Sequence, residues 1–365
     1  MPDGKTVIRK HKASLNFEKV INTNIYNQNP IKAFSFEIDN EKQNVLNKVS
    51  KHTLLGGISK IKRGIELGQV TELIECNNCG KYSEISTKYY SKRDANKCKY
   101  CESKIDFNSK FTISSRKKNV NYSLPCLSGR EINRYTVNSY YYIIPNLISI
   151  DYKEDIYSNK NLYVKRIATK PEATLVNHLC YTFNTLYSIY DLKINTKESL
   201  MLILNSKLIS FYYELVFNLG MNLTTQVTVE YLKKIPIAKV LKSDLFQKMS
   251  NIILNETNYL NTKSDNFSDY IISQFQLEKL SKKLQNWYSL EFSDFIKEIN
   301  KAIKNNKQEK LTKLQEMEWM EVFEVKKAEA QTIKTQIDQT DKEIDAMVYE
   351  LYGLTDDEIK IVENS

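Results

Sequence analysis

The sequence contains very little histidine and glycine, and this shortage excludes several classes of catalyst. Its 365 residues include 3 histidines and 9 glycines. Three histidines (His11, His52 and His178) form no arguable Ser/His/Asp or Cys/His arrangement for nucleophilic catalysis. No Gly-x-Gly-x-x-Gly string or glycine-rich phosphate loop is present. The sequence therefore gives no sign of chemistry carried by the chain itself, and we expect no catalytic residue in it.

Long apolar runs are also missing. No stretch of about 18 apolar residues suggests a membrane span, so we expect no membrane partner. The first residues, MPDGKTVIRKHK, have no apolar run behind their charges, unlike a secretory signal peptide. These features predict a cytoplasmic protein whose thiols stay reduced.

Arginine is scarce and lies only in the first half of the chain, where the seven arginines end at Arg166. Residues 1–245 contain 37 Lys and Arg against 22 Asp and Glu, whereas residues 246–365 contain 16 against 22. Basic side chains neutralise phosphates, and arginine can also bind guanine through two hydrogen bonds. The first part of the chain is therefore predicted to contact nucleic acid.

Four of the six cysteines form two Cys-x-x-Cys pairs separated by 18 residues. They are Cys76, Cys79, Cys98 and Cys101. Two such knuckles can place four thiolates around one Zn²⁺ ion, and a closed four-thiolate site is structural because no position remains for water. Disulfides, an iron cluster or a redox pair are weaker interpretations. Cys126 and Cys180 are expected to be small buried core residues.

The spacer between the knuckles is basic and rich in tyrosine. A zinc-bound hairpin could project Lys92 and Arg93 into a DNA groove, or the spacer could be an ordinary solvated loop. The sequence leaves both interpretations open.

The pattern of apolar residues predicts an α+β fold in two parts. A β-rich domain over residues 15–242 carries a zinc-ribbon insertion at 73–105, and strand-like alternation covers most of residues 15–75 and 106–190. One helix is expected over 196–217.

From residue 243 to 365 the pattern becomes that of an α-helical bundle or coiled-coil tail. Amphipathic segments follow one another, and the last long helix should run from about 310 to 352 and stop before Gly353. Thr355 with Glu358 predicts a capped final helix.

Several short strings occur in a characteristic order. They are GIELG (64–68), LSGREINRY (127–135), LNSKLISFY (204–212) and KIPI (234–237), followed by the tail EIDAMVYELYGLTDDEIKIVE (343–363). This ordered set resembles the TaqI-like C-terminal specificity domain of adenine-specific DNA methyltransferases and type IIG restriction–modification enzymes, over about residues 15–363.

The resemblance implies recognition of a DNA target rather than catalysis. In this family an N-terminal domain uses S-adenosylmethionine to methylate a flipped adenine, and the C-terminal domain reads the sequence of the double-stranded DNA. This chain lacks the cofactor-binding glycines and the Asn-Pro-Pro-aromatic tetrapeptide of the catalytic domain. S-adenosylmethionine and any methyltransferase or nuclease activity are therefore expected only on a partner subunit or domain.

The candidate DNA contacts are basic side chains of the first part of the chain. They are Lys60, Lys62, Arg63, Lys92, Arg93, Arg116, Arg130, Arg134 and Arg166. Which of them contact bases and which contact phosphates stays open, and Arg130 could instead pair with Glu131 or a carbonyl. Two other functions also stay open: an enzyme with an unrecognised site, and a protein-interaction scaffold that uses the helical tail.

Overall fold

The computed structural model describes residues 5–12, 15–22, 38–66, 68, 71–84, 97–98, 100–106, 110–145, 154–157, 160–218 and 226–365. The chain divides into two compact units, and each is described by itself. Unit 1 comprises Met1–Phe246 and Met347–Ser365, and unit 2 comprises Gln247–Ala346. Within the described residues, no single helix has the length and apolarity to cross a membrane. Among these residues, one pair of helices bent against each other, Lys197–Asn205 and Lys207–Phe217, is long and apolar enough when the two are taken together.

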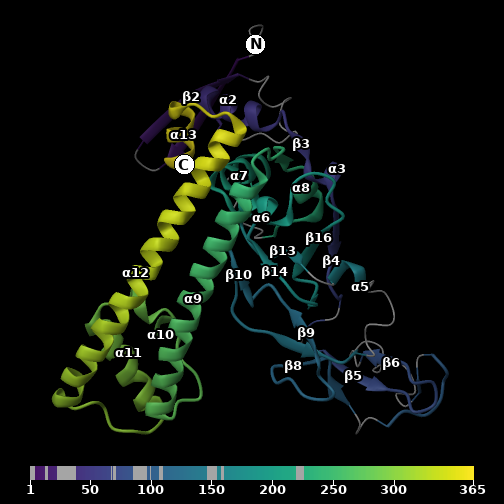
Figure 1. The fold of residues 1–365 in the computed structure, drawn as a ribbon, viewed down its shortest axis with the longest axis vertical. Coiled ribbons are helices and arrows are strands. Elements are labelled where there is room, and N and C mark those ends of the chain that lie inside the picture. Colours follow the sequence, from purple (N-terminus) through teal and green to yellow (C-terminus); the bar gives the residue numbers. More distant parts are fainter. Residues whose placement is uncertain are drawn as a thin grey trace. The chain divides into compact units, whose positions relative to one another are not determined.

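The fold is α+β, as the sequence predicts, and the described strands all belong to unit 1 (Figure 1). The strands are β1 (Lys5–Lys12), β2 (Leu15–Asn22), β3 (Thr53–Leu54), β4 (Lys60–Arg63), β5 (Glu72–Glu75), β6 (Tyr82–Glu84), β7 (Phe111–Thr112), β8 (Ser114–Ser115), β9 (Leu124–Leu127), β10 (Ile132–Asn133), β11 (Thr136–Val137), β12 (Tyr141–Ile143), β13 (Asn161–Lys165), β14 (Ala173–Val176), β15 (Tyr181–Thr182), β16 (Leu186–Tyr190) and β17 (Pro236–Ile237).

Two four-stranded sheets form the centre of unit 1. One has the order β14-β13-β16-β4 and is antiparallel throughout. The other has the order β15-β9-β12-β8, in which β15 runs parallel to β9. Side chains from both sheets, among them Tyr163, Tyr181 and Leu127, share one buried cluster. The short segment between β15 and β16 passes directly from one sheet to the other.

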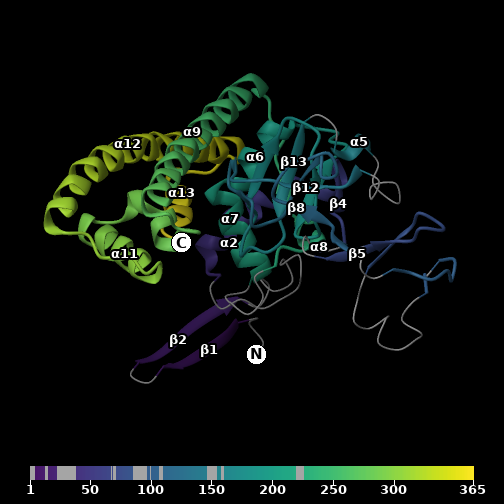
Figure 2. The same ribbon diagram turned by 90° about the horizontal axis from the view of Figure 1, so that it is seen from below.

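The remaining strands form smaller sheets. β6, β5 and β7 make a three-stranded sheet that carries the first cysteine pair, and β10 pairs with β11 as a hairpin. Pro236 lies in β17 and pairs with Leu54 of β3. β1 and β2 form a two-stranded antiparallel ribbon, which Figure 2 shows clearly.

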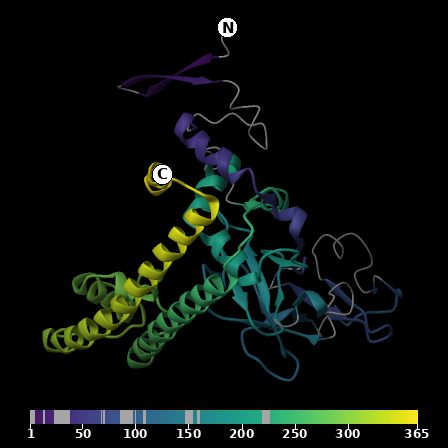
Figure 3. The same ribbon diagram turned by 45° about the horizontal axis from the view of Figure 1, so that its top comes forward.

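The helices of unit 1 are α2 (Asn40–Val49), α3 (Leu55–Ile58), α5 (Glu154–Tyr157), α6 (Lys197–Asn205), α7 (Lys207–Tyr213), the π-helix η3 (Glu214–Asn218), α8 (Val229–Lys233) and α13 (Asp356–Glu363). α6 packs against β13 and β14. α13, the short yellow helix at the C-terminus in Figure 3, packs against α2 and α7. Lys48 of α2 donates a hydrogen bond of 2.6 Å to Glu358 of α13. The C-terminal helix is thus part of the core of unit 1.

Unit 2 is a helical bundle with its own core. Its helices are α9 (Ser243–Phe275), which begins in unit 1, α10 (Lys282–Gln285), the 3₁₀ turn η4 (Trp287–Ser289), α11 (Phe292–Asn305) and α12 (Lys313–Tyr352), which ends in unit 1. Trp287 is 1% exposed, and its ring lies 4.5 Å from the ring of Phe267. Phe295 and Phe323 stack beside them at a centroid distance of 4.5 Å.

Two predictions of local structure were wrong. Residues 40–49 form a helix instead of part of a strand region, because Asp39 accepts a hydrogen bond from the backbone NH of Lys42 and caps it. The helix expected over 196–217 is broken at Ser206, whose ψ of 156° is extended and whose hydroxyl caps α7 at Ile209.

Candidate metal cluster and nucleic-acid interface

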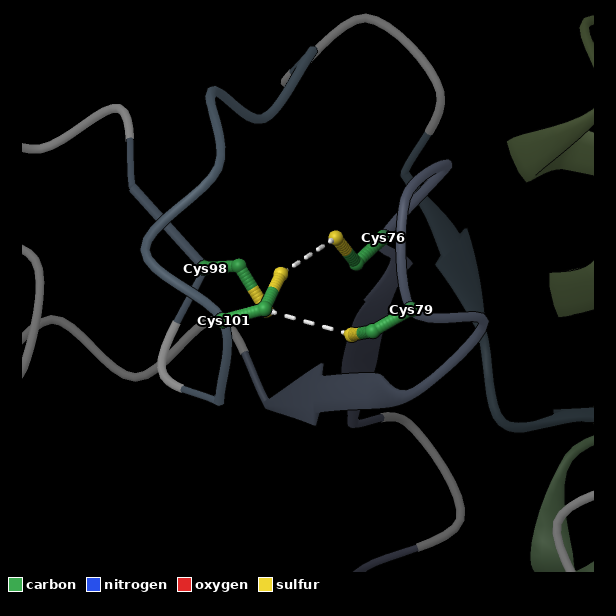
Figure 4. A group of neighbouring side chains, drawn as sticks. All are labelled: Cys76, Cys79, Cys98 and Cys101. Atoms are coloured by element: carbon green, nitrogen blue, oxygen red, sulfur yellow. Dashed lines mark hydrogen bonds between the residues drawn. The ribbon is translucent and has the colours of Figure 1, made fainter.

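The four cysteines of the Cys-x-x-Cys pairs converge on one point (Figure 4). Their sulfur atoms all lie within 4.8 Å of one another. The Cys76 and Cys101 sulfurs are 3.5 Å apart, and those of Cys79 and Cys98 are 3.7 Å apart. A disulfide would need about 2.05 Å, so all four cysteines are free thiols in this structure.

The two knuckles are built in the same way. In the first, the Cys76 amide donates to Lys81 O at 3.1 Å and the Gly80 amide donates to Cys76 O at 2.7 Å. In the second, Cys98 and Glu102 take the places of Cys76 and Gly80, with bonds of 2.8 Å to Ser103 O and 3.0 Å to Cys98 O. The residue after each second cysteine has positive φ, +65° at Gly80 and +59° at Glu102. This repeat places two sulfurs on the same side of each turn.

The cluster fits a tetrahedral metal ion. Four sulfurs at about 2.3 Å from Zn²⁺ are separated by about 3.8 Å from one another, close to the two measured separations. Hydrogen bonds with the side chain and backbone of Ser103 lower the pKa of the Cys101 thiol to about 6. A backbone hydrogen bond at Lys81 lowers the pKa of Cys79, but burial and the three neighbouring thiols outweigh it and raise this pKa to about 12, so a metal would have to displace protons from this group. The donor set and its spacing are therefore compatible with zinc.

The lobe around the cluster has a small core of its own. Apart from the cysteines it contains Ile74 and Ile105, both almost fully buried. Lys92 and Arg93, the predicted contacts in the spacer, lie outside the described residues. The other two cysteines, Cys126 and Cys180, are completely buried in the core of unit 1 as expected, and burial raises the pKa of both thiols.

A second convergence occurs at residues 183–185, the turn that links the two large sheets, hereafter the 183–185 turn. The GIELG string binds one side of it, because the Ile65 amide donates to Thr182 O at 2.7 Å and the Gly64 amide donates to Leu186 O at 3.2 Å. The LSGR string binds the other side, with the Gly129 amide 2.9 Å from the Thr185 hydroxyl. Two strings that are 60 residues apart in the sequence thus meet at one place.

Glycine is required at the tightest of these contacts. A Cβ atom added to Gly64 would lie 2.2 Å from Thr182 O and 2.4 Å from Phe183 O, closer than real Cβ atoms approach. Both neighbours are backbone atoms of the sheet junction and have little freedom to move. The close approach explains why a glycine stands at position 64.

Three of the predicted arginines surround the 183–185 turn. The Arg63 Nε donates to Asn184 O at 3.1 Å, and an Arg166 terminal nitrogen lies 3.5 Å from the same oxygen. The Arg166 amide also donates to Thr185 O at 2.9 Å. Arg130, next to Gly129, is exposed, and within the described residues its side chain has no partner. The alternative pairing of Arg130 with Glu131 is not found among the described residues, because Glu131 binds another arginine.

That arginine is Arg116. Its guanidinium is 2.7 Å from a carboxylate oxygen of Glu131, which is 3% exposed, and 2.7 Å from the Tyr141 hydroxyl. It also donates to Ser139 Oγ at 2.9 Å and lies over the Tyr141 ring. Arg116 therefore holds the start of a loop in place, and its contact with DNA stays a prediction.

The other predicted contacts within the described residues are Lys60, Lys62 and Arg134, and their surroundings differ from those of the arginines above. Lys60 forms an exposed ion pair of 2.7 Å with Asp191. Lys62 is half-buried on β4, opposite Ser188. Arg134 is half-buried, and its guanidinium carbon lies 5.1 Å from the centre of the Tyr135 ring.

Two protein families match separate parts of the chain. Residues 124–237 match the TaqI-like C-terminal specificity domain. The match covers less than half of the chain and includes the LSGR string, the 183–185 turn and Arg166. A second family, described as a domain of unknown function (DUF8810), matches residues 240–348. Comparison with curated proteins gave no significant match.

The match confirms the resemblance seen in the sequence for residues 124–237, a shorter range than the 15–363 expected, and supports a role of this specificity domain in DNA target recognition. Asn184, Thr185 and Gln226 were not among the predicted site residues. They position two arginines, since Gln226 accepts a hydrogen bond of 3.2 Å from Arg166. The sequence signal for Asn184 and Thr185 was the turn-like string FNT (183–185) within a strand region, whereas Gln226 had none.

Proposed function

We propose that this chain recognises a specific sequence in double-stranded DNA for a restriction–modification system. The catalytic residues and S-adenosylmethionine would belong to a partner chain or domain. The observation that carries the proposal is the placement of Arg63 and Arg166 at the carbonyl of Asn184, with Arg130 next to Gly129, which binds Thr185. Arg130, Arg166 and the 183–185 turn lie within the matched specificity domain.

The chemistry of this set suits a duplex. Arg63 and Arg166 both donate to the carbonyl of Asn184, and Glu66 and Gln226 hold their other nitrogens, so their planar groups have lost rotamer freedom before any contact forms. Arg130 is exposed and free to bind a guanine edge or a phosphate. Phosphate contacts fix the position of such a surface on the duplex, whereas base contacts provide its specificity.

Zinc has a structural role in this proposal. The four thiolates would hold the two knuckles together in a lobe whose own apolar core is small. A site with four protein ligands leaves no open position for substrate. We therefore assign no reaction to the metal.

A binding selection tests the proposal. The zinc-loaded chain is incubated with a random duplex library at about 150 mM salt, and the bound DNA is sequenced. We expect enrichment of a motif of several base pairs. Failure to retain any duplex, with zinc bound and the fold intact, would contradict the proposal. Labelled S-adenosylmethionine added to the same mixture should give no methylated DNA without a partner.

Arg130 provides the sharpest variant, because within the described residues its side chain makes no hydrogen bond or ion pair that the substitution would break. Replacement by lysine should weaken binding to the selected duplex by about 1–3 kcal/mol if the guanidinium binds a base with two hydrogen bonds. The matched control is Lys279→Gln in unit 2, an exposed residue that should leave binding unchanged. Equal affinity of Arg130→Lys and the unaltered chain would exclude a two-bond contact.

A specific observation favours a protein partner for unit 2. The first part of α12 exposes apolar side chains on several sides: Leu314, Met317, Met320, Val322 and Val325. Such a set on one helix is typical of a protein–protein interface. We propose that this segment binds the methyltransferase or nuclease partner. Replacing Leu314 and Met317 by serine should abolish co-purification with a co-expressed catalytic subunit and leave the melting temperature unchanged.

A further inference from the structure

The loop between β8 and β9, residues 116–123, has a solvent-exposed apolar residue, Val120, at its tip. Its sequence is RKKNVNYS. Val120 is 94% exposed, more than any other large apolar side chain in the described part of the chain. A single exposed valine needs no special explanation on most surfaces. What distinguishes this one is the rigidity and the charge of its surroundings.

The tip is fixed by its own hydrogen bonds. The Asn119 side-chain oxygen accepts from the amides of Asn121 at 2.9 Å and Tyr122 at 2.8 Å. The Asn119 amide donates to Tyr122 O at 3.1 Å, which closes the turn from the other side. Side chains of this kind that bind their own backbone stabilise tight turns. Val120 therefore sits on a closed four-residue turn.

Both ends of the loop are also anchored. At the start, the Arg116 guanidinium is held by Glu131, Tyr141 and Ser139, as described above. At the end, the Tyr122 hydroxyl donates a hydrogen bond of 2.8 Å to Thr112 O. The loop thus holds its apolar tip away from the protein core without relying on apolar packing.

The charge around the tip is positive. Lys117 and Lys118 precede it and are exposed, and within the described residues neither side chain has an ion-pair partner. Beside the tip lies an open hollow of about 480 Å³, lined in part by the rings of Tyr82, Phe111 and Tyr122. Glu75 also lines it and is the one acidic side chain among its lining residues.

We propose that Val120 inserts between two base pairs of the bound duplex and unstacks them, with Lys117 and Lys118 on the flanking phosphates. Proteins that bend DNA use apolar side chains as wedges in this way, next to basic residues that hold the backbone. This inference rests on the proposed DNA recognition and assigns to the loop a mechanical role that the arginines at the 183–185 turn do not have.

The surroundings favour DNA over a protein partner for this tip. Val120 lies between lysines and asparagines, at the rim of a hollow lined in part by aromatic side chains. The two exposed lysines beside it favour the phosphates of DNA over an apolar docking site on a protein. A rigid tip also suits insertion, because an unstacking step costs a few kcal/mol and a flexible loop would add an entropy cost.

Fluorescent DNA tests the wedge directly. The zinc-loaded full chain is added to a series of 30-base-pair duplexes at about 50 mM salt. Each duplex carries 2-aminopurine at a different position, and a second set carries dyes at both ends for measurement of bending by energy transfer. We expect a rise in 2-aminopurine fluorescence at one or two positions, together with a bend. Val120→Ser should lose both signals and bind no more than tenfold more weakly.

The same assay can separate the contribution of the two lysines to DNA binding from that of the apolar side chain of Val120. Val120→Ser removes no charge, so the slope of log affinity against log salt should not change. Replacing Lys117 and Lys118 by methionine should reduce that slope by about 2. Val120→Leu should keep the fluorescence rise. The matched control is Leu241→Ser, which removes another highly exposed aliphatic side chain (85%) and should leave all signals unchanged.

The outcomes distinguish the two proposals. If Val120→Ser bends and unstacks DNA as the unaltered chain does, or if the unaltered chain binds without any fluorescence rise, the wedge is wrong and DNA recognition stands. If the unaltered chain does not bind the duplexes even at this low salt, both proposals fail.

Discussion

At the scale of single residues, the two knuckles of the cysteine cluster differ in one informative position. Gly80 and Glu102 occupy the same place and have nearly the same positive φ. A residue with a Cβ atom pays a steric cost of about 1–2 kcal/mol in this region, whereas glycine does not. The second knuckle therefore holds a strained glutamate where the first holds a relaxed glycine.

This difference predicts opposite effects of two substitutions. A Cβ on Gly80 would meet no atom within 4 Å, so Gly80→Ala tests the backbone alone and should weaken zinc binding by about 1 kcal/mol, or roughly fivefold. Glu102→Gly should strengthen it by about 0.5 kcal/mol, because the relief of strain exceeds the entropy that glycine adds to the unfolded chain. Competition with a chromogenic chelator measures both.

Glu102→Gln is the control for charge in this pair. It keeps the strained backbone and removes the carboxylate, so it should leave the zinc affinity near that of the unaltered chain. If Gln and Gly at this position strengthen binding equally, charge rather than backbone strain governs the second knuckle.

At the scale of elements, sequence patterns predicted those features that depend on neighbouring residues. The long helix α12, its end before Gly353 with φ of +66°, and the capping box of Thr355 and Glu358 all follow local rules and were confirmed. The break at Ser206 did not follow from periodicity. It depends on Asn205, whose side chain makes two hydrogen bonds to the backbone of Ala173 in β14, a contact between distant parts of the chain.

The candidate site shows the same division. The metal cluster could be predicted because its four ligands lie within two short knuckles. The arrangement at the 183–185 turn could not be predicted from the sequence. Gly64, Gly129 and Arg166 are far apart in the sequence and meet only where the two large sheets join. Glu131 likewise forms its ion pair with Arg116 and not with its neighbour Arg130. Arg116 directly follows β8, which the pairing with β12 holds in place.

The cap of α13 predicts a pH-dependent contribution to stability. Burial opposes ionisation of Glu358, but hydrogen bonds from Lys48 and Thr355 outweigh it and hold the pKa of this carboxyl below its usual range. Because the folded-state pKa is lowered, the carboxylate stabilises the fold fully above about pH 4.3, its unfolded value, and loses this effect as the pH falls through the folded value. Glu358→Gln should therefore lower the free energy of unfolding by about 1 kcal/mol at pH 7.

Urea denaturation at pH 7, 5.5 and 3.5 measures this contribution. The two proteins should differ equally at pH 7 and 5.5 and approach each other at pH 3.5. Lys48→Met should cost part of the same energy and have a smaller effect in the Glu358→Gln background, where the shared hydrogen bond is already lost and the bond of 2.9 Å from Lys48 to Gly353 O remains. A difference that grows toward low pH would contradict the assignment.

At the scale of the whole molecule, the separate cores of the two units predict separate responses to metal removal. Both tryptophans of the chain, Trp287 and Trp319, lie in unit 2, where Trp287 is buried against Phe267. The cysteine cluster lies in unit 1 and has a small core of its own around Ile74 and Ile105. Tryptophan emission therefore reports only on the helical bundle.

We expect a zinc chelator to unfold the cysteine lobe while the bundle stays folded. A lobe with so few buried apolar side chains depends on the metal for its stability. Limited proteolysis should then cut within residues 71–113, while the tryptophan emission maximum and its thermal transition stay unchanged. Cys98→Ser should give the same cleavage without chelator, because three remaining thiolates leave the tetrahedron incomplete. A shift of the tryptophan emission on chelation would show that the bundle depends on the metal, which its own aromatic core gives no reason to expect.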